Sequence, residues 1–280
     1  MQEVILDTVL DTVKLIPFLL VTYLLMEYME HRAKGRMIEL IRKNGVAGPV
    51  MGAVIGIFPQ CGFSASAANF YAGHMINLGT LVAVFLSTSD EMLPILLSEQ
   101  VPVGTIAEIL LFKVMTAVVV GVAVNVLWKM LRREQTEVDI HSMCEKEHCH
   151  CENGIVRSAI HHTLHITGFI LLFSFVLNTA ILFIGEETLA GFLMNKPVIG
   201  PMLTAMIGLI PNCAASILIT QMYLEGLMGV GAMMAGLLAG SGVGLAVLFK
   251  VNHRLKENLT ILGLLYAIGA GVGILLELFV

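Results

Sequence analysis

The sequence predicts an all-α polytopic membrane protein made of two inverted-topology repeats, each with a Pro-broken re-entrant hairpin. The first observation is composition: of 280 residues, 57% are hydrophobic and only 13% are charged, which leaves too little polar surface to cover a water-soluble domain. The second is the length of the apolar runs, several of which reach the roughly 20 residues that a helix needs to cross a bilayer. The third is a match of the chain with itself at an offset of 152 residues.

The self-match involves glycine, proline, cysteine and serine, whereas chance matches in an apolar sequence would involve mainly leucine and alanine. It is densest where Ile57–Ser64, IFPQCGFS, aligns with Leu209–Ser216, LIPNCAAS. We therefore interpret the chain as a tandem duplication, with a first membrane repeat at 1–131, a His/Cys-rich linker at 132–154 and a second repeat at 155–280. Matched pairs include Gly48 with Gly200, Pro59 with Pro211, Cys61 with Cys213, Ser89 with Ser241 and Gly121 with Gly273.

The first repeat opens with a helix predicted over residues 4–28, whose acidic start lacks a signal-peptide cleavage site, so we expect it to be retained. After a basic loop come two apolar pieces, Ala47–Phe58 and Gly62–Gly73, each of about a dozen residues and separated by a proline. Each is too short to span the bilayer alone, so the pair predicts a hairpin whose tip lies in protein or faces a cavity. A span over Met75–Leu97, interrupted at residues 87–91, and a long helix over Val103–Leu131 follow.

The second repeat has the same plan. We expect a helix at about 158–184, a hairpin at about 198–226 with its tip at residues 211–213, a span at about 227–249 and a final helix at about 259–280. The count is therefore six spanning helices plus two hairpins, or ten segments if the hairpins cross fully.

Lysine and arginine concentrate in three segments, Arg32–Lys43, Lys129–Arg133 and Lys250–Lys256. Cytoplasmic loops carry such an excess. Each repeat crosses the membrane three times, or five times if the hairpins cross fully, and with either number all three basic segments fall on one side. Because both numbers are odd, the second repeat is inserted upside down relative to the first. This predicts a multi-pass plasma (inner) membrane protein with both termini outside and the linker in the cytoplasm.

The two hairpin tips are the predicted substrate site. A proline in a helix frees backbone carbonyls, and the tips add amide, hydroxyl and thiol ligands in matching positions. These candidates are Gln60, Cys61 and Ser64 in the first tip and Asn212, Cys213 and Ser216 in the second. The alternative is that each proline only marks a kink and that the cysteines are small buried hydrophobes.

Asp90 and Glu91 lie in the interrupted span and are further candidates, because ionisable groups inside a membrane are costly. The residues at the equivalent positions of the second repeat are Gly242 and Val243, so only the first repeat has carboxylates here. One of the two carboxylates could bind a cation or carry a coupling proton. The alternative is a surface loop in which Glu91 caps a short helix. Glu108 and Lys113, in the closing helix, are expected to pair in a structural role.

The linker carries thiolate and imidazole ligands of the kind that zinc, copper and other thiophilic ions take. Their spacing matches no standard zinc finger, and the histidines at 161, 162 and 165 could join them; the alternative is a flexible loop. The predicted metal ligands are Cys144, His148, Cys149, His150 and Cys151.

Three motifs, IGIFPQCGFSASAANFYAGHMINLGTL, STSDEMLPILL and IGLIPNCAASILITQMYLEG, are similar to those of the ten-transmembrane heavy-metal exporters, a family whose members are labelled arsenic efflux proteins or manganese transporters. The resemblance covers nearly the whole chain and implies export of a metal or metalloid from the cytoplasm. Manganese would favour the oxygen ligands, whereas arsenic and soft ions would favour Cys61 and Cys213.

Inverted repeats joined at broken helices are the architecture of secondary transporters. We therefore expect an alternating-access exporter, not an enzyme, with the lipid bilayer and a metal or metalloid ion as partners, no nucleic acid and no cofactor. The sequence carries no nucleotide-binding motif, so a gradient, most simply of protons, would drive export. A homo-oligomer, a transporter of a small organic anion, and a metal-sensing membrane protein with an active linker remain alternatives.

Overall fold

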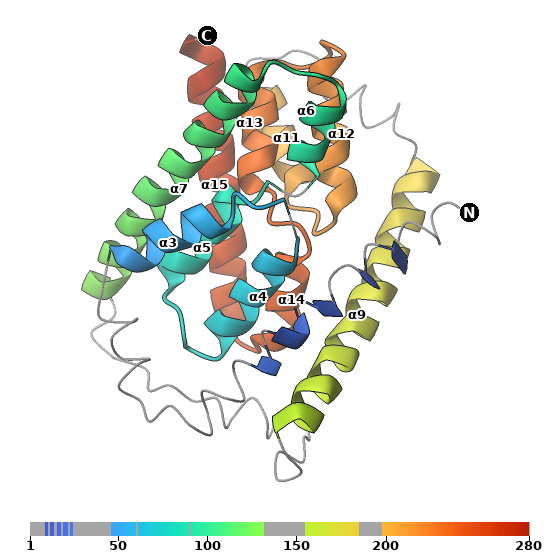
Figure 1. Cartoon of the computed structure of the whole chain (residues 1–280). Coiled ribbons are helices and arrows are strands. Elements are labelled where there is room, and N and C mark those ends of the chain that lie inside the picture. Colours follow the sequence, from blue (N-terminus) through green and yellow to red (C-terminus); the bar gives the residue numbers. More distant parts are fainter. Residues whose placement is uncertain are drawn as a thin grey trace.

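The computed structural model describes parts of residues 9–24, residues 46–131 apart from Gln60 and Asp90, residues 155–184 and residues 198–279. All regular structure in these ranges is α-helical. The first half contains α3 (Ala47–Ile55), α4 (Cys61–Ala72), α5 (Leu78–Ser87), α6 (Met92–Ser98) and α7 (Val103–Leu131) (Figure 1). The second contains α9 (Ile155–Ile184), α11 (Ile199–Gly208), α12 (Cys213–Leu224), α13 (Val230–Ala239), α14 (Gly244–Val251) and α15 (Leu255–Phe279).

The two halves repeat the same order of helices at the offset that separates Cys61 from Cys213, 152 positions. Each helix from α3 to α7 begins 152 residues before its counterpart among α11 to α15. The pair α3 and α4, like the pair α11 and α12, consists of helices of only 9 to 12 residues around a proline. The repeat found in the residue matches is therefore also a repeat of secondary structure.

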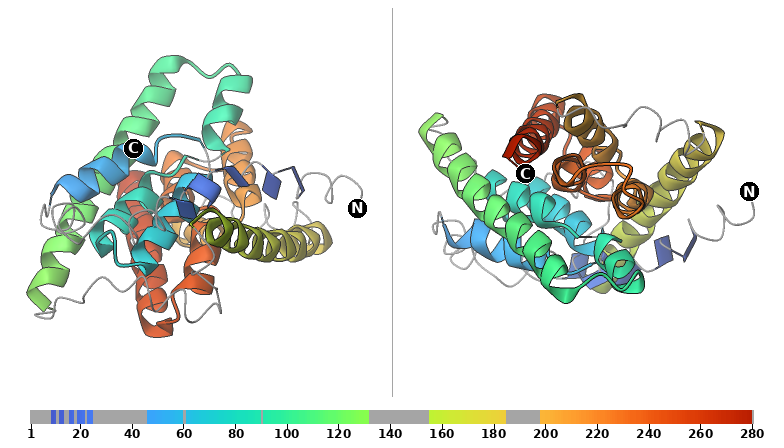
Figure 2. Two further views of the ribbon diagram at one scale, coloured as in Figure 1. Left: turned by 60° about the horizontal axis from the view of Figure 1, so that its bottom comes forward. Right: turned by 90° about the horizontal axis from the view of Figure 1, so that it is seen from above.

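Four described segments are long and apolar enough to cross a membrane: Leu78–Ser98, Val103–Met130, Val230–Val251 and Leu255–Phe279. The first and third are mostly buried in the protein, whereas only 22% of the second and 28% of the fourth are buried. On α7 the exposed face is apolar and includes Leu111, Met115 and Val119, which are 57–63% exposed. In a bilayer this face contacts lipid instead of water. Both views of Figure 2 place α7 and α9 at the periphery of the molecule.

Both buried spans are broken in the middle. The interruption predicted at residues 87–91 is present, since α5 ends at Ser87 and α6 begins at Met92. The span predicted at about 227–249 is present as Val230–Val251, but it has a break that the sequence did not predict: α13 ends at Ala239 and α14 begins at Gly244. The cause is Gly240 and Gly242, the latter with φ of 52°, a left-handed conformation that glycine adopts without strain.

The helices within each half pack through glycines at equivalent positions. A Cβ placed on Gly121 of α7 would lie 2.7 Å from the carbonyl oxygen of Gly79 on α5. In the second half a Cβ on Gly273 of α15 would lie 2.6 Å from the carbonyl oxygen of Gly231 on α13. Only glycine allows the two backbones to come this close, as is usual in membrane helix pairs.

Between the halves, the helix that follows each proline, α4 or α12, packs against a helix of the other half. Figure 1 shows α4 beside α14 toward the bottom of the molecule and α12 near α6 toward the top. At the first contact a Cβ on Gly244 would lie 2.8 Å from the Cβ of Ser64. The Tyr71 hydroxyl also donates a 2.7 Å hydrogen bond to Oε1 of Glu257 on α15. The halves are thus interlocked, not merely placed side by side.

We predict that Gly121→Ala and Gly273→Ala each lower the melting temperature in detergent, because the added methyl group forces the paired helices apart at a cost of about 1–3 kcal/mol. Thermal unfolding of the purified protein measures this effect. Gly271→Ala is the matched control on α15, since a Cβ there meets no atom within 4 Å. Equal melting temperatures for Gly273→Ala and Gly271→Ala would contradict the packing described here.

Candidate functional site

The two segments predicted as hairpin tips meet inside the protein through their cysteines. Cys61 is the first residue of α4 and Cys213 the first residue of α12, and their Sγ atoms lie 2.7 Å apart. Neither cysteine forms a disulfide, and both are buried. The N-terminus of a helix carries a partial positive charge, so both sulfurs lie at the positive end of a helix dipole. Two residues from opposite halves therefore form one buried dithiol.

The serine one turn further along each helix repeats the same contact. The Ser64 hydroxyl donates to the carbonyl oxygen of Cys61, and the Ser216 hydroxyl donates to that of Cys213, both at 2.8 Å. Each hydroxyl oxygen keeps a lone pair for another partner. Ser64 is fully buried against α14, whereas Ser216 is partly exposed to a pocket.

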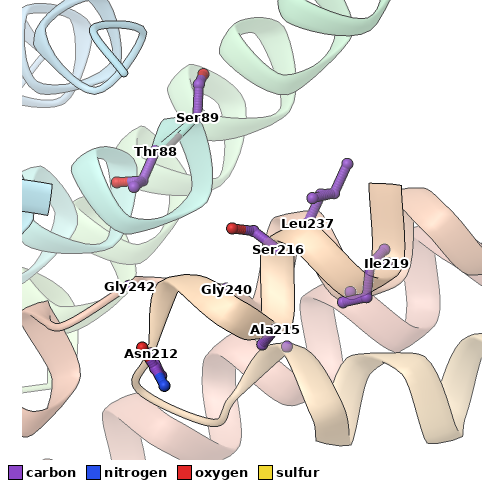
Figure 3. Close-up of a pocket in the computed structure, with 11 residues that line it drawn as sticks. Thr88, Ser89, Asn212, Ala215, Ser216, Ile219, Leu237, Gly240 and Gly242 are labelled. Carbon is purple, nitrogen blue, oxygen red and sulfur yellow. The ribbon is translucent and has the colours of Figure 1, made fainter. Parts of the chain in front are cut away.

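This pocket lies between the break after α5 and the start of α12. Figure 3 shows Thr88 and Ser89 on one wall, α12 on the other, and the Ser216 side chain directed from α12 toward them. Asn212, 7% exposed and without a side-chain capping hydrogen bond, lines the pocket just before α12. The internal volume is about 10 Å³, which is room for roughly one water molecule. Uncharged side chains and glycines make up the rest of its lining: Gly208, Ala215, Ile219, Gly236, Leu237, Gly240 and Gly242.

A buried lysine lies against the same pocket. Lys113 of α7 is 0% exposed, and its Nζ donates to the carbonyl oxygens of Thr88 and, at 2.9 Å, Leu237, both of which line the pocket. The pairing expected with Glu108 is wrong, since that side chain is exposed and Lys113 instead contacts the backbone of two other helices.

The remaining predicted residues have separate outcomes. Glu91 is the N-cap residue of α6, half-buried and without a side-chain capping hydrogen bond. Gln60 and Asp90 lie outside the described residues, as do the linker residues Cys144, His148, Cys149, His150 and Cys151. Within the described ranges, no three His, Cys, Asp or Glu side chains are grouped to hold a metal ion. His161 and His165 are exposed on α9.

Sequence reasoning missed Thr88, Ser89, Lys113 and the Gly240–Gly242 turn as parts of the site. The match of Ser89 with Ser241 at the repeat offset was the available signal, because both serines lie in the breaks of equivalent spans. The signal for Lys113 was its position: a lysine in the middle of an apolar spanning helix.

The fold and the lipid-facing apolar helices define an all-helical, multi-pass membrane protein. A family model described as "Putative, 10TM heavy-metal exporter" matches the chain twice, over residues 1–153 and 114–254. The chain belongs to this family. No curated protein and no solved structure matches it.

We predict that Cys61 and Cys213 form a disulfide when membranes are treated with diamide, each thiol losing a proton and the pair giving two electrons to the reagent. The background carries Cys144→Ser, Cys149→Ser and Cys151→Ser and a protease site within residues 132–154. After cleavage the two halves should migrate together on a gel without reductant and separately with it, because the Sγ atoms are 2.7 Å apart.

Cys213→Ser in the same background is the control and should give separate halves in both lanes. Separate halves from the protein that retains both Cys61 and Cys213 would show that the hairpin tips do not meet as described.

Proposed function

We propose that this protein is a secondary transporter that exports a heavy-metal ion or metalloid from the cytoplasm, with the substrate held between the two hairpin tips. The observation that carries the proposal is the buried dithiol of Cys61 and Cys213, which joins equivalent positions of the two halves. Thiolates select soft and borderline ions over hard ones such as Mn²⁺. Membership of the heavy-metal exporter family supports the same substrate class.

The contact of the two sulfurs lets both halves hold one ion. Two thiolates on one tetrahedral ion, at the roughly 2.3 Å of a zinc–sulfur bond, lie about 3.8 Å apart. The Sγ atoms of Cys61 and Cys213 are in contact across the two tips, so both can bind the same ion. Because each tip belongs to a different half, an ion that prefers one arrangement of the halves would shift the population toward it.

The pocket beside the tips favours an ion over the organic anion considered as an alternative. Its volume of about 10 Å³ admits a dehydrated ion, whereas pockets for organic ligands usually occupy about 300 Å³ or more. Asn212 and Ser216 add oxygen ligands at its wall. The metal-sensor alternative depends on the linker, which lies outside the described residues.

We propose further that the two halves are inserted with opposite orientation and that the short hairpin helices turn back within the membrane. Helices of 9 and 12 residues, as in α3 and α4, are about 13–18 Å long, less than the roughly 30 Å hydrocarbon core. In Figure 1 the end of α7, near Lys129, and the start of α15, near Lys256, lie toward the same end of the molecule. This arrangement supports a cytoplasmic linker and outward termini in a plasma (inner) membrane.

A proton gradient is the proposed driving force, and no catalytic role is assigned to any residue. Export would then require both the dithiol and the membrane gradient. The metal content of cells tests the first requirement directly.

Cells that express the wild-type chain should retain less of one thiophilic element after challenge than cells with the Cys61→Ser, Cys213→Ser variant. Loss of both thiolate ligands should reduce export by at least about tenfold, because changes merely next to a metal ligand already cost that much. Intracellular arsenic and metals are measured by mass spectrometry at matched expression.

Cys144→Ser, Cys149→Ser, Cys151→Ser is the matched control and should export like wild type. If the control loses export and the hairpin variant keeps it, the linker is the active part and the sensor alternative is favoured. If no element differs between wild type and the hairpin variant, the proposed substrate class is wrong.

The orientation is tested with single cysteines in a protein lacking the native five. Glu99→Cys lies in the connection between α6 and α7 and His253→Cys in the connection between α14 and α15, and both side chains are exposed. A membrane-impermeant thiol reagent applied to intact cells should label position 99 and not position 253, as the positive-inside rule requires. The opposite labelling would reverse the proposed orientation, and with it the direction of export.

A further inference from the structure

Lys113 is a buried cation in the interior of a membrane protein. Its side chain is 0% exposed, although only 22% of the spanning segment of α7 is buried. A charged group at this depth is costly, so membrane proteins keep it only where it has a partner and commonly a function. The proposed transport site assigns Lys113 no function.

The ammonium group of Lys113 lies where two helix C-termini converge. Thr88 is the C-cap residue of α5, and Leu237 is in the last turn of α13, where carbonyls lack partners within the helix. Each helix C-terminus carries a partial negative charge of about half an elementary charge. One lysine, by donating to both carbonyls, satisfies a helix end from each half of the chain.

The repeat is broken at this position. One offset later, the residue equivalent to Lys113 is Leu265, which is also fully buried but carries no charge. The residues equivalent to Thr88 and Leu237 are Gly240 and Phe85. In a transport cycle the two halves would exchange conformations between two states. Because Lys113 has no charged counterpart in the second half, only one of these states keeps both of its hydrogen bonds, and the two states differ in free energy.

We propose that Lys113 is a positioning residue that links the two halves beside the pocket and sets the balance between the two states of the transport cycle. The link between the halves stands on the hydrogen bonds alone, and its role in transport rests on the proposed function. Thr88 and Leu237 both line the pocket. A movement of the halves that widens the pocket between these residues must therefore lengthen at least one of the two hydrogen bonds.

The experiment measures how fast Cys61 and Cys213 form a disulfide with diamide, in the background that carries serine at the three linker cysteines and a protease site between the halves. This rate reports the fraction of molecules whose tips meet, and it requires no substrate. Lys113→Met removes the charge while keeping a long side chain. It should slow the disulfide about tenfold, since hydrogen bonds from a charged donor are worth at least that factor in an equilibrium.

Lys113→Arg keeps a charged donor and should restore most of the wild-type rate, which a purely space-filling role would not require. Leu265→Met is the matched control at the equivalent position of α15 and should react like wild type. If Lys113→Met does not give folded protein by size-exclusion chromatography, Lys113→Gln, which is neutral but keeps a polar end, replaces it with the same expectation.

A disulfide rate for Lys113→Met or Lys113→Gln equal to that of wild type overturns the proposal, as does an equal slowing by Lys113→Arg and Lys113→Met. Metal export by the wild-type chain is measured separately. A slow disulfide in Lys113→Met, together with no export of any element by wild type, would leave the link between the halves standing and remove the proposed function. If the wild-type chain exports an element but Lys113→Met leaves the disulfide rate unchanged, the proposed function stands and the link between the halves is removed.

Discussion

The requirement that every backbone polar group in a membrane finds a partner governs this structure. Water is absent from the hydrocarbon core, so each helix end placed there exposes carbonyl or amide groups at a cost of several kcal/mol. The chain nevertheless ends helices in its interior, at the tips before α4 and α12 and at the breaks after α5 and α13. The positive ends meet at the two cysteines, and the negative ends meet at Lys113.

Packing within each half supports these interior helix ends. The glycine contacts fix α5 against α7 and α13 against α15, and so hold each broken span on a continuous helix. The two halves reach the same spacing with different residues. In the first, Gly52 of α3 faces Val84 of α5; in the second, Thr204 of α11 faces Gly236 of α13. The small and large residues have changed places, which preserves the volume between the helices.

The fold could largely be predicted from the sequence because its repeat is carried by residues with strong backbone preferences. The prolines and glycines that align at the offset locate the tips, and Ser87–Glu91 locates the first break through its polarity. The second break was missed because Gly240, Ser241 and Gly242 are small and uncharged, and so do not interrupt an apolar run.

The site could be predicted only in part, because its key contacts join segments far apart in the chain. Asn212 and Ser216 line the pocket, but Ser64 packs on α14 instead. Glu108 and Lys113 are close in the sequence, but a separation of five helical residues places their side chains about 140° apart. The roles of Gln60, Asp90 and the linker cysteines and histidines stay predictions.

The packing of α4 against α14 of the other half has a consequence for biosynthesis. The face of α4 that holds Ser64 is covered by Gly244 of α14, which the ribosome adds only after roughly 180 further residues. At about 5–20 residues per second, α4 waits some 10–40 s in the membrane before its partner exists. During that time its small, polar face must be shielded by lipid, by the insertion machinery or by a temporary neighbour. The first half is therefore an obligate intermediate that cannot reach its final packing until the second half has been inserted.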